Sequence, residues 1–217
     1  MEETILTGVV LAGGESRRMG QNKALLDVGR EKVISTIVGA MSKAGLDVII
    51  AANEQTASAY RMLGRDIVCD RFPGQGPLSG IHAGLHAAKT PWIVVAACDM
   101  PFVAPELFRF LKKSVEKAEA GIASGNACQA VIPVEEGRVQ PLLAAYHASA
   151  LPALEDSLVG GRLRMTDWLE RLQVRYIPED VLAKETGLVA GHVFFNMNRP
   201  EDYRAALAKR REEEAGR

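Results

Sequence analysis

The stretch that decides the fold is Gly8-Val-Val-Leu-Ala-Gly-Gly-Glu-Ser-Arg-Arg-Met-Gly-Gln-Asn-Lys23. Its apolar run, residues 9–12, is typical of a buried strand. The run breaks at Gly13-Gly14 into a loop that carries three cations, Arg17, Arg18 and Lys23. Glycines let backbone N–H groups approach an anion closely, and cations neutralise phosphate charge. The stretch therefore predicts a strand that ends in a loop suited to a nucleoside triphosphate.

This loop is neither of the two common phosphate-binding loops. The dinucleotide fingerprint G-x-G-x-x-G is absent, and Lys23 neither follows a glycine nor precedes a serine or threonine, as the Walker A pattern requires. A glycine turn after a strand is also common in α/β proteins in general. The cations, rather than Gly13-Gly14 alone, favour the phosphate-binding interpretation.

The composition is that of an ordinary globular protein. Hydrophobic residues make up 47% of the 217 residues and charged residues 24%, which excludes the disordered and fibrous classes, and we expect one domain over residues 1–217. The net charge of −1 gives no reason to expect nucleic acid or an anionic membrane as a partner.

Cysteine usage and the first residues indicate the compartment. The three cysteines, Cys69, Cys98 and Cys128, are widely spaced, so neither a disulfide framework nor a C-x-x-C metal site is indicated. The acidic start lacks the basic and apolar regions of a signal peptide, and no apolar run approaches the roughly 20 residues of a membrane span. We expect a cytoplasmic protein.

Polar residues follow three further apolar runs. Residues 48–52, 67–69 and 92–97 are expected strands, and they are followed by Asn53, Asp70 and Asp99. Expected helices at residues 32–43 and 58–63 alternate with them, which predicts a three-layer α/β fold with a mostly parallel, Rossmann-like sheet. Because ligands bind at the carboxyl ends of such strands, these residues and Gly13 should meet in one cleft. Asn53 has an alternative role, since Asn is also a common turn former.

Asp99 is the expected metal ligand. It lies in Cys98-Asp-Met-Pro101 at the tip of a central strand, and Pro101 limits how the chain can turn. Mg²⁺ needs few protein carboxylates because it takes its other ligands from water and phosphate oxygens. The alternative is an aspartate that caps the following turn.

The stretch from Asp70 to Leu85 is rich in glycine and proline and then opens a helix. Gly80 and Gly84 would leave one helix face nearly bare, so that either a ligand or the sheet can approach closely. His82 and His86 are four residues apart on the same helix, but no general-base Glu stands between them and no third zinc ligand is evident. We expect ordinary histidines on a helix face.

The second half of the chain continues the α/β pattern. We expect a helix over residues 105–118, an antiparallel hairpin of residues 129–134 and 140–146, a helix over residues 148–158, and an edge strand over residues 174–177. Residues 191–202 should bring Asn196 and Asn198 to a strand end before a helix opened by Pro200.

Four motifs in order resemble one family. Leu-Ala-Gly-Gly-x-Ser-x-Arg-Met-Gly-x-x-Lys, from Leu11 to Lys23, resembles the nucleotidylyltransferase signature, and its Gly-Gly form is most similar to the molybdenum cofactor guanylyltransferases of the MobA type. Gly-Pro-Leu-Ser-Gly-Ile, Cys-Asp-Met-Pro and the final Asn-Met-Asn also resemble that family. Two departures are Asn22, where relatives often carry Asp, and Arg199, where Thr is usual.

The resemblance implies transfer of GMP from GTP to the terminal phosphate of molybdopterin, with release of pyrophosphate and with Mg²⁺ as cofactor. It implies catalytic roles for Arg17, Lys23 and Asp99, with Arg18 as a further helper, and metal binding by Asp99. The implied nucleotide-binding residues are Leu11, Ala12, Gly13, Gly14, Lys23, Asn53, Asp70, Gly80 and Asp99. The implied pterin-binding residues are Gln140, Asn196 and Asn198, and apo-molybdoenzymes or their chaperones are implied partners.

Three alternatives remain at this point. A cytidylyltransferase for the same pterin would share the fold, although Leu-Ala-Gly-Gly favours guanylyl transfer. A sugar-phosphate nucleotidylyltransferase is a weaker competitor. A catalytically silent module that binds nucleotide or cofactor would have had no need to keep the charged residues.

Overall fold

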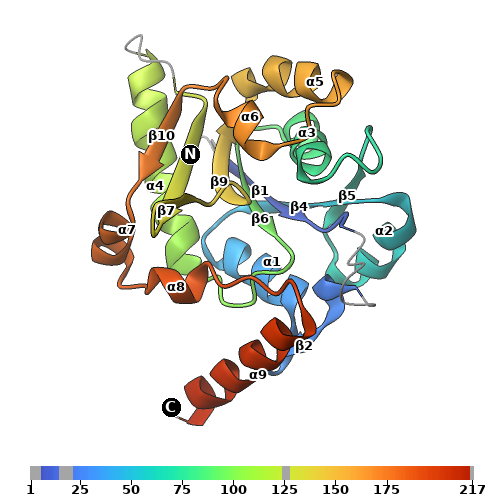
Figure 1. Ribbon diagram of the computed structural model, residues 1–217, viewed down its shortest axis with the longest axis vertical. Helices are drawn as coiled ribbons and strands as arrows, with labels where there is room; N and C mark the ends of the chain where they lie inside the picture. The colour runs from blue at the N-terminus through green and yellow to red at the C-terminus, as the bar shows by residue number, and fades with distance from the viewer. Residues whose placement is uncertain (1–5, 15–21, 124–127, 216–217) are drawn as a thin grey trace.

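A central β-sheet is the middle layer of the computed structural model (Figure 1), which describes residues 6–14, 22–123 and 128–215. Its strands are β1 (Leu6–Leu11), β4 (Asp47–Ala52), β5 (Asp66–Cys69), β6 (Trp92–Ala97), β7 (Ala130–Glu135), β8 (Arg138–Val139), β9 (Leu143–His147) and β10 (Val174–Ile177). Within the described residues the order is β10-β7-β9-β6-β1-β4-β5, with β8 paired to β7. Neighbouring strands are parallel except that β9 is antiparallel to β6 and β7, and β8 is antiparallel to β7. The predicted mostly parallel sheet with an antiparallel portion is confirmed.

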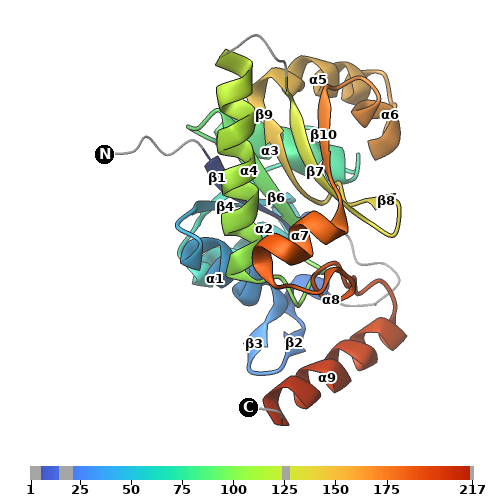
Figure 2. The same cartoon turned by 90° about the vertical axis from the view of Figure 1, so that its left-hand side faces the viewer.

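Helices cover both faces of the sheet, as Figures 1 and 2 show. One face packs against α1 (Val33–Lys43), α2 (Glu54–Tyr60), α4 (Pro105–Ala123), α7 (Glu179–Thr186) and α8 (Ala190–Val193), and the other against α3 (Pro77–Ala87), α5 (Leu151–Val159) and α6 (Met165–Leu169). Strand β1 is buried throughout: Leu6 and Val10 join the first hydrophobic cluster, and Val9 and Leu11 the second. This burial on both faces explains the continuous apolar run, and the predicted three layers are confirmed.

Smaller elements complete the chain. Among the described residues, the 3-10 turn η1 (Lys23–Leu25) precedes β2 (Asp27–Val28), η2 (Arg61–Leu63) extends α2, and η3 (Ala148–Ala150) precedes α5. Strand β2 pairs with β3 (Glu31–Lys32). Helix α9 (Pro200–Ala215) extends below the body beside this hairpin (Figure 2), where the Tyr203 hydroxyl donates to the Asp27 carbonyl. No helix of the described part of the chain is both long and apolar enough to cross a membrane.

The bare face of α3 packs tightly on β1. A Cβ added at Gly84 would lie 2.9 Å from Cγ1 of Val9, and one at Gly80 would lie 3.1 Å from Cδ2 of Leu11. These distances are shorter than ordinary van der Waals contacts, so the two glycines bring helix and strand together. The close helix–sheet packing considered in the sequence is present, and it sets the height of α3 above the sheet.

The turn predicted between the two strands of the hairpin is present in the structure. Strand β7 reverses at Glu136-Gly137, whose φ values of 46° and 74° both lie in the left-handed region, and continues as β8. A two-residue turn with positive φ at both positions matches the right-handed twist of the paired strands.

The second predicted strand, residues 140–146, is wrong in its first part. The Leu143 N–H donates to the Gln140 carbonyl across Pro141, which forms a turn with proline at its second position. Strand β9 begins only after this turn, and it pairs antiparallel with β7, as the predicted hairpin requires. Its other edge pairs antiparallel with β6, which the sequence did not indicate. Pro141 was itself a signal of this break, since proline seldom lies inside a central strand.

Two other predicted elements differ from the structure. Asn196 and Asn198 do not follow a strand: the residues before them form the single turn α8, in which the Phe194 N–H donates to the Ala190 carbonyl. Burial of Val193 and Phe194 against the core has overridden their strand preference. The helix predicted over residues 58–63 begins earlier, at Glu54, because the Asn53 side chain accepts the Thr56 N–H as an N-cap.

Candidate active site

A cavity of about 440 Å³ lies at the carboxyl ends of β1, β4, β5 and β6. Its size is within the range of small-molecule sites. It is lined by Leu11, Gly13, Gly14, Lys23, Ala51, Asp70, Gly74, Gly76, Pro77, Gly80, Ala97, Cys98, Asp99 and Leu142. Four strand ends and the start of α3 therefore meet around one space, as the sequence predicted.

Lys23 and Asp99 form a charged pair in this cavity. Asn22 accepts the Ala24 N–H and so caps η1, which places Lys23 next to the end of β6. The Lys23 Nζ lies 3.6 Å from the Asp99 Oδ2, and it donates to the Asn198 Oδ1 at 3.0 Å. The lysine is therefore oriented from two sides.

The Asp99 carboxyl is poorly solvated. Burial raises its pKa above the ordinary value, while the Lys23 charge and hydrogen bonds act in the opposite direction. Its Oδ1 is buried and has no hydrogen-bond partner among the described residues. An ionised carboxylate is costly to bury when one of its oxygens receives no hydrogen bond and no cation. The Asp99 Oδ1 is therefore suited to bind a cation.

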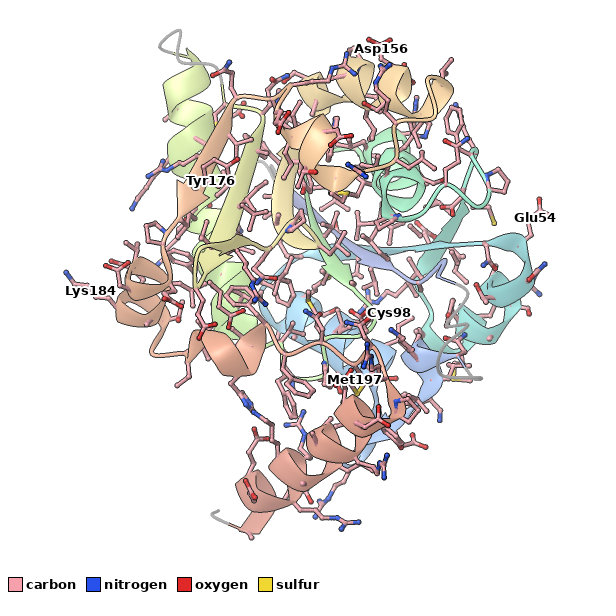
Figure 3. The ribbon with its side chains drawn as sticks, viewed as in Figure 1. Glu54, Cys98, Asp156, Tyr176, Lys184 and Met197 are labelled. Carbon is pink, nitrogen blue, oxygen red and sulfur yellow. The ribbon has the colours of Figure 1, made fainter. Side chains whose placement is uncertain are left out.

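The segment around Asn198 is fixed beneath Asp99. The Met197 N–H donates to the Asp99 carbonyl at 2.9 Å, and Met197 is fully buried. Figure 3 shows Cys98, the residue before Asp99, and Met197 in the same region below the sheet. The Asp202 Oδ2 accepts the N–H groups of Asn198 and Arg199, both at 2.8 Å. These bonds hold the backbone from which Asn198 reaches Lys23.

Asp70 lies opposite Gly13 in the cavity. A Cβ added at Gly13 would lie 3.1 Å from the Asp70 Oδ2, so the glycine leaves room for this carboxyl. Burial raises the pKa of Asp70 from the ordinary 3.8 to about 6. Its Oδ1 is buried and accepts no hydrogen bond from the described residues. The cavity thus holds two carboxyl oxygens that can accept a bond from a ligand.

The glycine loop is supported from behind. The Asn53 Nδ2 donates to the Gly13 carbonyl at 2.9 Å, and the Tyr60 hydroxyl donates to the Ala12 carbonyl at 3.2 Å. The Asn22 Nδ2 in turn donates to the Tyr60 oxygen at 2.8 Å. An aspartate at position 22 could not donate this bond, so the amide fits Tyr60.

Comparison with known proteins places this geometry in a family. The chain matches the MobA-like NTP transferase domain over residues 8–176. The chain belongs to the MobA-like NTP transferase family. It is 38% identical, over 90% of its length and 89% of the relative's, to a probable molybdenum cofactor guanylyltransferase of Pelotomaculum thermopropionicum. It is 32% identical to a protein of the same description from Carboxydothermus hydrogenoformans, over 93% and 95% of the two chains.

A solved structure agrees. Molybdopterin-guanine dinucleotide biosynthesis protein A of Archaeoglobus fulgidus superposes with a TM-score of 0.79 at 32% identity, and the match covers 95% of this chain and 99% of that one. The family predicted from the motifs is confirmed, and with it the nucleotidyltransferase fold. The MobA-like family match ends at residue 176, so α7, α8 and α9, with Asn198, lie beyond it.

Most nucleotide-site residues predicted for this MobA-like protein line the cavity. They are Leu11, Gly13, Gly14, Lys23, Asp70, Gly80 and Asp99. Ala12 and Asn53 are instead seen in the support of the loop. Arg17 and Arg18 lie outside the described residues.

The residues predicted for the pterin are more scattered. The Gln140 Nε2 donates to the Glu135 Oε2 at 3.1 Å, at the turn before β9. Half-buried Asn196 and exposed Asn198 flank Met197. Leu142, which lines the cavity, was missed because an apolar residue in an expected strand carries no chemical signal.

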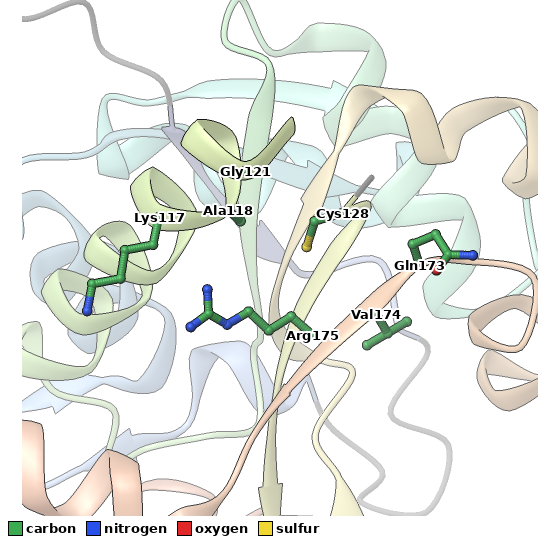
Figure 4. Close-up of a pocket in the computed structure, with 7 residues that line it drawn as sticks. All are labelled: Lys117, Ala118, Gly121, Cys128, Gln173, Val174 and Arg175. Atoms are coloured by element: carbon green, nitrogen blue, oxygen red, sulfur yellow. The ribbon is translucent and has the colours of Figure 1, made fainter. Parts of the chain in front are cut away.

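A second hollow, of about 300 Å³, lies at the outer edge of the sheet between α4 and β10 (Figure 4). It is lined by Lys117, Ala118, Gly121, Cys128, Gln173, Val174 and Arg175, and so by none of the predicted site residues. Burial raises the pKa of the Cys128 thiol, whose Sγ donates to the Ala130 carbonyl. A protonated thiol is a weak nucleophile, so this hollow offers no comparable chemistry.

Proposed function

We propose that this protein transfers GMP from GTP to the terminal phosphate of molybdopterin and releases pyrophosphate. The observation that carries the proposal is the pairing of Lys23 with Asp99, 3.6 Å apart, in a glycine-lined cavity at the strand ends. The names of the relatives, which refer to molybdenum cofactor guanylyl transfer, supply the identity of the substrates.

The reaction needs little covalent chemistry from the protein. The attacking phosphate oxygen is already anionic, so no general base is required. A new bond forms to the α-phosphorus of GTP, and the bond to the leaving pyrophosphate breaks. Catalysis then rests on holding two polyanions in line and on stabilising the charge that develops on the leaving group. In our proposal Lys23 supplies this stabilisation, together with Arg17 and with Arg18 as a less direct helper.

Asp99 is the proposed ligand of a divalent cation, Mg²⁺. The buried Oδ1 without a hydrogen-bond partner in the described chain fits such a ligand. When bound, Mg²⁺ would neutralise charge on the triphosphate oxygens. A single carboxylate suffices, since Mg²⁺ keeps water and phosphate oxygens as its other ligands.

The remaining roles follow from position. We propose that the backbone of residues 11–14 and Gly80 binds the nucleotide, and that the Asp70 Oδ1 accepts a hydrogen bond from it. Asn53 contributes to nucleotide binding by donating a hydrogen bond to the Gly13 carbonyl, which holds the glycine loop in place. On the pterin side we propose Gln140, Asn196 and Asn198. Asn198 also orients Lys23, which would link the two substrates.

The direct test measures pyrophosphate release with Mg²⁺ and molybdopterin, and compares GTP with CTP and ATP. Release with GTP alone supports the proposal. Release with CTP would instead indicate the sister cytidylyltransferase, and release with a sugar phosphate in place of the pterin would indicate a sugar-phosphate enzyme. Binding of both substrates without release would indicate a silent binding module.

A pair of lysine variants separates the site from general charge effects. Lys23→Met should lower kcat/KM by at least roughly 100-fold, the typical loss when one preorganised electrostatic group is removed. Lys32→Met is the control, because Lys32 pairs with Asp27 in the β2–β3 hairpin at 3.1 Å and does not line the cavity. Equal activity of the two variants would contradict the role of Lys23.

We further propose that the reaction takes place in the cytoplasm and that the product passes to apo-molybdoenzymes or their chaperones.

A further inference from the structure

Three side chains that can bind a metal converge between α3 and α5. His82 and His86 are one helical turn apart on α3, and Glu155 faces them from α5. The Glu155 Oε1 lies 3.4 Å from the His82 Nε2 and 3.1 Å from the His86 Nε2. The three ligand atoms all lie within 4.8 Å of one another. The third ligand that the sequence did not reveal comes from a helix about 70 residues away along the chain.

We propose that His82, His86 and Glu155 bind a Zn²⁺ ion that links α3 to α5. Two imidazoles and one carboxylate form a donor set that zinc uses in proteins, with water as a fourth ligand.

The spacing of the ligands agrees with this metal. Zinc–nitrogen and zinc–oxygen bonds of about 2.0–2.1 Å in a tetrahedron place neighbouring ligand atoms roughly 3.3 Å apart. The two distances to the Glu155 Oε1, 3.4 and 3.1 Å, are close to this value. An ion would need the imidazoles to turn slightly toward each other, and their ring centroids are already 4.4 Å apart.

The three ligands differ in how far they are exposed to solvent. The His82 side chain is 2% exposed, His86 31% and Glu155 45%. One ligand is therefore buried beside Phe72, whose ring centroid lies 5.0 Å from that of His82, while the other two border solvent, from which an ion and its water ligand can enter. His86 and Glu155 need only side-chain adjustment on an open surface.

The protonation state is compatible with metal binding. Burial lowers the pKa of His82; His86 and Arg71 act in the same direction, whereas Glu155 opposes them. Neutral imidazole is the form that binds a metal. The Nδ1 of His82 has no hydrogen-bond partner in the described chain, so the ring is held mainly through Nε2 on the side of Glu155.

The ion would act on the architecture of the active site rather than on the reaction. Gly80, which lines the cavity, is two residues before His82 on α3. A zinc link to α5 would restrain the helix whose first turn borders the nucleotide cavity. This inference does not depend on which nucleotide is transferred.

The test is a competition titration of Zn²⁺ against a chromophoric chelator, with the full chain in excess Mg²⁺. We expect one Zn²⁺ per chain, and the same stoichiometry in Asp99→Asn, which removes the proposed magnesium ligand. His86→Gln and Glu155→Gln should each weaken zinc binding at least about tenfold. His192→Gln is the matched control, because His192 also pairs with a glutamate, Glu213 at 2.6 Å, but has no second histidine in that pair.

Thermal unfolding gives an independent readout. Zinc at about 100 times its Kd should raise the Tm by roughly 5–10 °C in the wild type and in His192→Gln. The rise should be lost in His86→Gln and Glu155→Gln at the same zinc concentration. Wild-type zinc affinity in these two variants, loss of the zinc in Asp99→Asn, or no saturable binding at all would overturn the proposal.

Discussion

The buried carboxyl of Asp70 makes a quantitative prediction about stability. Its pKa is raised from 3.8 to about 6 because burial disfavours the charged form. The folded protein therefore binds this proton more tightly than the unfolded chain does. The contribution to stability is fully present below about pH 4, and it is lost as the pH rises through 6. Above that pH, the charged Asp70 lowers the free energy of unfolding.

The magnitude follows from the shift. Two pKa units correspond to at most about 3 kcal/mol, and since the side chain is only half-buried, water screens part of this, which leaves about 1–2 kcal/mol. Asp70→Asn keeps the shape but removes the charge. The variant should be about 1–2 kcal/mol more stable than the wild type near neutral pH and about equally stable near pH 4.

Urea unfolding over this pH range, without nucleotide and with a chelator present, measures the difference. Asp66→Asn serves as the control for the loss of one charge, because Asp66 is exposed on the same strand, β5. A stability difference between Asp70→Asn and the wild type that stays constant with pH would refute the reasoning. So would a less stable variant at neutral pH. In the transferase assay, the same substitution should weaken GTP binding if Asp70 contacts the nucleotide.

Three further predictions concern the cavity and its supports. Asp99→Asn should lower kcat/KM at least about 100-fold in the pyrophosphate assay. The free energy of unfolding of Asp99→Asn should not fall below that of the wild type, because the substitution removes a charge that burial disfavours. Wild-type turnover by this variant would refute the assignment of Asp99. Asn198→Ala removes the 3.0 Å acceptor of Lys23, and we expect kcat to fall roughly tenfold. An unchanged kcat would show that Lys23 needs no such partner. Gly84→Ala should destabilise by about 1–3 kcal/mol in urea, because its Cβ would lie 2.9 Å from Val9. Gly39→Ala in α1, which would meet no described atom within 4 Å, should be neutral or stabilising, and equal effects would refute the packing argument.

The parts of the fold that the sequence predicted are those with a local cause. A strand buried on both faces must be apolar throughout, so β1, β4 and β6 were recognised together with the polar residues at their ends. Asp70 and Asp99 were predicted from their places after expected strands, Asp70 after the partly exposed edge strand β5 and Asp99 after Cys98 at the end of the buried strand β6, and from the motifs that resemble the family. The family motifs then supplied the nucleotide.

The parts that were missed depend on distant partners. The hairpin pattern indicated that β9 pairs with β7, but nothing near Leu143 indicates that its other edge pairs with β6. The apolar residues of α8 have the composition of a strand. Glu155 lies on the outer side of a helix, and its relation to His82 and His86 exists only after α3 and α5 have packed. Likewise, the contact between Lys23 and Asn198 joins residues 175 positions apart.

That long separation has a consequence for the synthesis of the protein. Lys23 and Asp99 leave the ribosome well before Met197 and Asn198, so a growing chain can pair its first parallel strands before Asn198, which accepts a hydrogen bond from Lys23, has been made. A message truncated just after β10 would encode the cavity walls and the whole MobA-like match, but not the segment that fixes Asp99 from below. We therefore expect transferase activity only after Met197 and Asn198 have been translated, when the sheet can already have formed.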